Sequence, residues 1–122
     1  MEHTESIIPE KEGIVEVEDE EGVTLYVRGS RYIARVASTL GSETRARIIE
    51  LLFEGPRDLD DIAAELRQSK ANISNQVKRL EDLGLVSSSY HAGERGVRKV
   101  VKPRVRRVVI ELAPPSRQYS PQ

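Results

Sequence analysis

The sequence predicts an α+β fold in which short amphipathic helices are followed by a β-hairpin. Between residues 30 and 83 the apolar residues recur at the three- and four-residue spacing of helices. After Gly84 the period falls towards two, as in half-buried strands, and glycines separate two such runs. Strand-like runs at residues 14–27 and 105–112 add extra strands near both ends of the fold.

Four helices are expected before Gly84. The first two begin at Ser30 and Ser42, the third follows Asp58 or Asp60 as its N-cap, and the fourth runs from Ser69 to Leu83. Their expected apolar positions are Ile33, Val36, Ala37 and Leu40 in the first, Ile48, Ile49, Leu51, Leu52 and Phe53 in the second, Ile62, Ala63 and Leu66 in the third, and Ile73, Val77 and Leu80 in the fourth.

The strands are expected in two hairpins and one single run. Residues 14–17 and 23–27 flank an acidic loop that ends in Gly22. Residues 85–90 and 97–102 flank the glycine-containing stretch His91–Gly96, which we expect to form a hairpin tip. The last strand spans residues 105–112.

Composition limits the type of protein. We expect one domain over residues 14–113, between a flexible acidic tail (1–13) and a disordered tail (114–122). The chain has no cysteine, so disulfides and thiolate metal sites are excluded. No apolar run approaches the roughly 20 residues of a membrane span, and the acidic N-terminus does not resemble a signal peptide. A cytoplasmic protein without a membrane partner is expected.

Charge is distributed unevenly along the chain. Residues 1–22 contain nine acidic residues and one basic residue, whereas residues 69–107 contain ten basic and three acidic residues. Such a basic block is typical of a phosphate-binding face, although a solvated face would also carry charge. Lys102, Arg104, Arg106 and Arg107 could extend this face or pair with the acidic N-terminal segment.

Two short helices joined by a tight turn and followed by a hairpin form a winged helix-turn-helix, whose second helix enters the DNA major groove. In the fourth helix, Ile73, Val77 and Leu80 fall on one narrow arc, which must face the core. The polar residues opposite that arc suit base edges and phosphates better than plain solvation. The expected DNA-binding residues are Ser69, Lys70, Ala71, Asn72, Ser74, Asn75, Gln76 (ranked lower), Lys78 and Arg79 in the helix, and Arg95, Arg98 and Lys99 on or beside the hairpin tip.

The stretch from Leu40 to Val86 resembles the ArsR-type winged helix-turn-helix repressors. The matching positions are Leu40-Gly41, Thr44-Arg45, Ser74, Lys78, Leu80-Glu81 and Gly84-Leu85-Val86. The resemblance implies a homodimer on a palindromic operator. It also implies base contacts by Asn72, Ser74, Asn75 and Gln76, and wing contacts around Arg95.

The sequence departs from this family in two ways. Where metal-sensing members carry a Cys-x-Cys motif it has Asp58 and Asp60, which beside Asp61 could bind a hard cation but are explained more simply by helix capping. With His3 and His91 as the only histidines, we expect no metal and no cofactor. The family's C-terminal dimerisation helix is replaced by a strand, so a dimer interface is expected on residues 33–40 with the N-terminal hairpin or that strand.

No catalytic constellation is visible in the sequence, so an enzyme is not expected. The sequence favours a sequence-specific regulator that binds double-stranded DNA, and the resemblance implies that it is a homodimeric repressor. A winged helix used for protein contacts in a transcription or chromatin complex is the alternative. RNA binding is disfavoured because Tyr90 is the only aromatic residue near the basic block.

Overall fold

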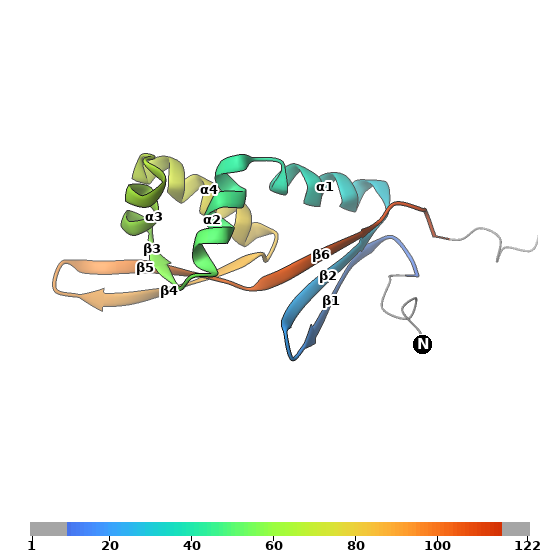
Figure 1. The fold of residues 1–122 in the computed structure, drawn as a ribbon, viewed down its shortest axis with the longest axis horizontal. Helices are drawn as coiled ribbons and strands as arrows, with labels where there is room; N and C mark the ends of the chain where they lie inside the picture. The colour runs from blue at the N-terminus through green and yellow to red at the C-terminus, as the bar shows by residue number, and fades with distance from the viewer. Residues whose placement is uncertain (1–9, 116–122) are drawn as a thin grey trace, which may run out of the picture. The chain divides into compact units, whose positions relative to one another are not determined.

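The computed structural model describes residues 10–115 (Figure 1). These residues belong to two compact units, one formed by residues 38–104 and the other by the segments up to residue 37 and from residue 105 onward. Most of the two predicted tails lies outside the described residues, and the predicted domain limits of 14 and 113 stay a prediction. None of the helices within residues 10–115 is long and apolar enough to cross a membrane.

Three capped helices form the first part of the 38–104 unit: α2 (Glu43–Leu52), α3 (Leu59–Leu66) and α4 (Lys70–Asp82). Each begins where a side-chain oxygen accepts a backbone N–H three residues later, which satisfies a donor that the first turn leaves without a partner. The caps are Ser42 for α2, Asp58 for α3 and Ser69 for α4. The predicted caps are confirmed, and Asp58 is the cap chosen from the two predicted for α3.

A three-stranded sheet completes this unit, with β3 (Arg57–Asp58), β4 (Val86–Gly93) and β5 (Gly96–Pro103) in the order β3-β5-β4. The long antiparallel pair β4–β5 is the wing (Figure 1). The prediction that His91–Gly96 forms its tip is wrong, because pairing continues to Gly93↔Gly96. Only Glu94 and Arg95 form the turn, and Gly96 has a φ of +102° that other residues rarely adopt.

The core of the 38–104 unit lies beneath α4. The predicted buried arc is confirmed, since Ile73, Val77 and Leu80 are each 0% exposed. Ile48, Leu52, Ile62, Leu85 and Val101 are also fully buried. Phe53, predicted to face the core, is 49% exposed because α2 ends at Leu52 and Phe53 is only its C-cap.

The other unit contains a second three-stranded sheet, in the order β1-β2-β6. Strands β1 (Gly13–Asp19) and β2 (Gly22–Arg28) form the predicted hairpin, and β6 (Val105–Glu111) lies parallel to β2. Asp19 Oδ1 closes the hairpin turn by accepting the backbone N–H groups of Glu21 and Gly22. Arg107 pairs with Glu21 at 3.7 Å, so this arginine follows the second of its two predicted roles.

Helix α1 (Ser30–Leu40) spans the boundary between the two units. Of its predicted apolar face, Val36 is fully buried and Ile33 and Leu40 are half-buried. Ala37, predicted on the same face, is exposed. At about 3.6 residues per turn, Ala37 lies beyond Ile33 and roughly 100° around the helix from the buried Val36, so it is at the edge of the covered stripe.

Candidate nucleic-acid interface

Helix α4 presents two different faces. Opposite the buried arc, Ala71, Asn75, Lys78 and Arg79 are exposed, and Ser74 is half-buried. We call Ala71, Ser74, Asn75 and Lys78 the outer face of α4. Asn75 and Lys78 make no side-chain hydrogen bond or ion pair with any residue in the range 10–115 that the structure describes, so both are available to a ligand.

Two amides predicted to contact DNA already have partners inside the protein. Gln76 and Asn72 are half-buried, and Gln76 Nε2 donates to Asn72 Oδ1 at 3.1 Å. The oxygen of Gln76 accepts from Nη1 of the buried Arg45 at 2.5 Å. Gln76 was the lower-ranked of the predicted DNA-binding residues, which agrees with its half-buried position. The hydrogen bonds of Asn72 could not be predicted from helical periodicity.

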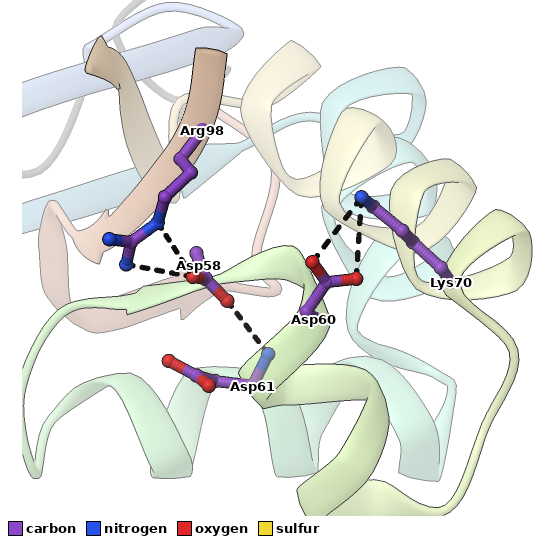
Figure 2. Close-up of polar contacts among 5 residues, drawn as sticks. All are labelled: Asp58, Asp60, Asp61, Lys70 and Arg98. Atoms are coloured by element: carbon purple, nitrogen blue, oxygen red, sulfur yellow. Dashed lines mark hydrogen bonds and ion pairs between the residues drawn. The ribbon is translucent and has the colours of Figure 1, made fainter. Parts of the chain in front are cut away.

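The start of α4 combines a cap with a weak ion pair. The Ser69 hydroxyl oxygen accepts the backbone N–H of Asn72 at 3.0 Å. Lys70 Nζ lies 3.3 Å from Oδ1 of Asp60 on α3 (Figure 2). Both side chains are largely exposed, and such surface pairs contribute little, so a phosphate can take the place of Asp60.

Arg98 on strand β5 is tied to the N-terminus of α3. We call Arg98 and Lys99 the base of the wing, because their side chains attach β5 to the helices. Arg98 Nη2 lies 2.8 Å from Oδ2 of Asp58, while Oδ1 of the same carboxylate accepts the Asp61 N–H at 2.8 Å (Figure 2). The hydrogen bond from Asp61 lowers the pKa of Asp58, burial opposes this shift, and the nearby Arg98 guanidinium lowers the pKa further. Arg98 therefore holds strand β5 against α3.

Lys99 fixes the same strand to α4. Its Nζ lies 3.1 Å from Oε2 of Glu81, which also accepts a hydrogen bond from the Ser88 hydroxyl. The Lys99 side chain is only 17% exposed. Arg98 and Lys99, both predicted to bind DNA, thus already have carboxylate partners within the fold.

The distal part of the wing has a different character. Arg95 in the turn makes no hydrogen bond or ion pair with the described part of the chain and is exposed. Two apolar residues of the strands, Val97 opposite Ala92 and Tyr90 opposite Lys99, are also exposed, at 69% and 68%. The strand register places both on the face that carries Lys99, whose Nζ lies 6.0 Å from the Tyr90 ring centroid.

The aspartates at the start of α3 are accounted for by contacts within the protein. Asp58 is the cap and binds Arg98, and Asp60 pairs with Lys70. Helix capping, preferred over a cation site for Asp58, is confirmed. Within residues 10–115 no group of three His, Asp or Glu side chains is arranged to hold a metal ion. His91 Nε2 lies 2.9 Å from the Ser89 hydroxyl, and His3 is outside the described residues.

The polar residues that support α4 were not selected as site residues from the sequence. Arg45 on α2 and Thr44 beside it contact Gln76 and Gln68, respectively. The sequence contained one signal for them, since Thr44-Arg45 is part of the ArsR-type resemblance. Nothing in the spacing indicated a role, because the partners lie 24 to 31 residues further along the chain.

The capped helices α2 to α4 and the β4–β5 hairpin define a winged helix-turn-helix domain. Residues 42–88 of the chain match the family model described as "Bacterial regulatory protein, arsR family". This segment is therefore similar to the helix-turn-helix of that family. A comparison with curated proteins finds no match.

Solved structures share this fold. A homodimeric winged helix-turn-helix DNA-binding domain from Mycobacterium bovis, described as a possible ArsR-family transcriptional regulator, is 27% identical with a TM-score of 0.51. The match covers 58% of this chain and 62% of that one, so the chain spans less than two thirds of it. Rv0081 from M. tuberculosis is 24% identical (TM-score 0.54; 62% and 72% covered), and reduced YodB from B. subtilis is 19% identical (TM-score 0.53; 63% and 74% covered).

Proposed function

We propose that this protein is a sequence-specific regulator of transcription that inserts α4 into the major groove of double-stranded DNA. The observation that carries the proposal is the outer face of α4. Asn75 and Lys78 lie there without partners in the described chain, beside the small residue Ala71, on a helix whose opposite side is anchored in the core. A major groove admits one such helix, and the Asn amide can pair with the edge of adenine.

The side chains divide into base and phosphate contacts. Asn75 and Ser74 suit base edges, and Ala71 lets the backbone approach the groove. Lys78, Arg79 and Lys70 suit phosphates, with Lys70 exchanging Asp60 for DNA. At the wing, Arg95 is the cation that we assign to DNA, whereas Arg98 and Lys99 act mainly by holding the wing in place.

A homodimeric repressor acting in the cytoplasm is the specific form of this proposal. The similar M. bovis domain is described as homodimeric and DNA-binding, which supports two copies on a palindromic site. We assign the dimer interface to α1 together with strands of the β1-β2-β6 sheet. Sedimentation of the full chain at micromolar concentration tests the assembly, and a monomer under those conditions contradicts it.

The DNA proposal is tested by selecting duplexes from a randomised pool and measuring their affinity against salt concentration. Affinity is expected to fall steeply as salt rises, because phosphate contacts release counterions. The double variant Asn75→Ala plus Lys78→Ala is expected to lose selection of the operator. Lys11→Ala, which removes one cation from the acidic N-terminal segment, serves as the control. Undiminished binding by the double variant rejects α4 as the groove helix.

A protein partner is the second candidate, and it is favoured by exposed apolar residues on the wing. Tyr90 and Val97 are both more than two thirds exposed and lie on one face of the β4–β5 pair. Apolar and aromatic side chains in such a position are typical of protein contacts. A chain that selects no duplex, but loses a captured protein partner on the change Tyr90→Ser plus Val97→Ser, supports this candidate over DNA.

A further inference from the structure

Arg45 is a buried cation that has only neutral partners. It is 7% exposed, and no carboxylate among the described residues lies within ion-pair distance of it. Its Nε donates to the Thr39 carbonyl at 2.6 Å and its Nη2 donates to the Ser38 carbonyl at 3.1 Å. Burial lowers its pKa, and the neighbouring charge of Arg79 lowers it further. The third partner is the side-chain oxygen of Gln76.

A guanidinium can only donate hydrogen bonds, so it dictates how the Gln76 amide is turned. The oxygen Oε1 accepts from Arg45 Nη1 at 2.5 Å, which leaves Nε2 on the other side of the amide. Nε2 then donates to Asn72 Oδ1 at 3.1 Å. By fixing the orientation of the Gln76 amide, Arg45 therefore also determines that Asn72 accepts a hydrogen bond from Gln76.

The chain of amides continues to the start of α2. Asn72 Nδ2 donates to Gln68 Oε1, and Gln68 Nε2 donates to the Thr44 hydroxyl oxygen at 3.5 Å. We call Arg45, Gln76, Asn72, Gln68 and Thr44 the amide relay. Every amide in it donates towards Thr44 and accepts from the side of Arg45, so the relay has one direction. The terminal hydroxyl could equally donate, so Arg45 is the end that fixes this direction.

This direction determines what Asn72 can offer to a base. Its oxygen faces Gln76, one turn further along α4, and its nitrogen faces Gln68, which precedes the helix. One hydrogen on Nδ2 and one lone pair on Oδ1 stay free, because each atom uses only half of its capacity. The free acceptor and donor are thus arranged in a fixed order along α4. Adenine presents an acceptor and a donor side by side in the major groove, so their order matters for recognition.

We infer that Arg45 is a positioning residue for base recognition, which acts through the amide relay to fix the order of donor and acceptor that Asn72 presents to DNA. The inference rests on the proposed function for its consequence in DNA binding. The relay itself is a property of the free protein, so the two can be tested separately.

The variant Gln76→Glu reverses the relay without removing the partner of Arg45. The new carboxylate accepts from Arg45 but has no hydrogen to donate to Asn72. The Asn72 amide must then turn so that Nδ2 donates to the carboxylate, Gln68 must turn after it, and the Thr44 hydroxyl becomes the last donor. Ala46→Glu, at an exposed position of α2 outside the relay, adds the same charge as a control.

Side-chain amide resonances of the free, isotope-labelled full chain report on the relay. Gln76→Glu is expected to shift the signals of both Asn72 and Gln68, although Gln68 has no contact with position 76 in the relay. Ala46→Glu is expected to leave both signals in place. An unchanged Gln68 signal in Gln76→Glu overturns the relay, whether or not the protein binds DNA.

Selection from a randomised duplex pool reports on base recognition. Gln76→Glu is expected to change the preference at one base pair of each half-site by about tenfold, in the range of a single good side-chain–base contact. Ala46→Glu is expected to weaken all duplexes evenly. If Gln76→Glu shifts the Gln68 signal but selects the same bases as the wild type, the inferred role of Arg45 in recognition is wrong. If the wild type selects no duplex, the proposed function fails, and so does that role.

Arg45 itself is tested by a pair of substitutions. Arg45→Met removes the donor that fixes the relay, so both amide orientations become populated and the preference at that base pair relaxes by about tenfold. Arg45→Lys keeps a buried donor for Gln76 and is expected to restore most of the preference. If Arg45→Met lowers affinity for every sequence equally and keeps the wild-type preference, Arg45 only stabilises the fold and the inference is overturned.

Discussion

The base and the tip of the wing carry the same kinds of residue but use them differently. Arg98 at the base binds Asp58, and Lys99 binds Glu81, so both cations connect β5 to the helices. Arg95, three residues before Arg98, has no such partner in the described chain. Helix α4 shows the same division between Gln76, which binds Arg45, and Asn75, which is free. Where the fold already pairs a basic or amide side chain, DNA can use only the hydrogen-bonding capacity that its partners leave, as at Asn72.

The largest effect on the free energy of unfolding is expected for a substitution in the core beneath α4. Leu80→Ala leaves a cavity beneath α4 and is expected to lower the free energy of unfolding by about 2–5 kcal/mol, because Leu80 is 0% exposed. Lys78→Ala, two residues earlier on the outer face, is expected to change it by less than about 0.5 kcal/mol. Urea unfolding of both variants measures the difference. Similar losses in the two would contradict the assignment of the two faces.

The next largest effect on stability is expected at Asp58, the partner of Arg98 at the base of the wing. Asp58→Ala removes the cap of α3 and the partner of Arg98, and is expected to cost about 1–2 kcal/mol of unfolding free energy. Asp58→Asn keeps a capping oxygen and is expected to recover most of that loss. A cost below about 0.5 kcal/mol for Asp58→Ala would mean that the base of the wing does not depend on this residue.

Asp58 also predicts a dependence on pH. Its pKa is lower in the folded protein than its ordinary value of 3.8, so its contribution to stability is present above that value. As the pH falls below about 3.8 and through the lowered pKa, this contribution is lost. Unfolding measured between pH 6 and pH 2, at roughly unit intervals, is expected to show a smaller acid loss in Asp58→Asn than in the wild type. Parallel curves would contradict this.

The second contact at the base is expected to contribute less. Lys99→Met keeps much of the buried stem but leaves Glu81 with only Ser88, and is expected to cost about 1 kcal/mol. A double-mutant cycle with Glu81→Gln isolates the coupling between the two side chains. Coupling near zero would show that Lys99 is free for another ligand, as its place in the sequence had suggested.

Local patterns predicted which face of α4 is buried, but contacts between distant residues decide which of its polar side chains already have partners. Periodicity alone separates Ile73, Val77 and Leu80 from Asn75 and Lys78, since helical geometry fixes which residues share a face. It cannot show that Asn72 and Gln76 are joined to Arg45 on another helix.

The fold, too, could be predicted from the sequence only where neighbouring residues determine it. The three helix caps and the β1–β2 hairpin follow from residue types within a few positions of one another. The pairing of β6 alongside β2 in parallel, and the two-residue strand β3 against β5, bring together segments more than 40 residues apart. The wing turn was misplaced because His91-Ala92-Gly93 has loop-like composition but pairs with β5.

The smallest effect on stability is expected at Arg95 in the wing turn. There the informative measurement is the affinity for DNA. Arg95→Ala is expected to change the unfolding free energy by less than about 0.5 kcal/mol, because the side chain is exposed and has no partner in the described residues. Its affinity for all duplexes is expected to fall to a similar degree, and the slope of log affinity against log salt to decrease by about one. A change in base preference instead would mean that Arg95 reads the minor groove. An unchanged salt slope would remove the tip from the interface and leave the wing as a structural element held by Asp58 and Glu81.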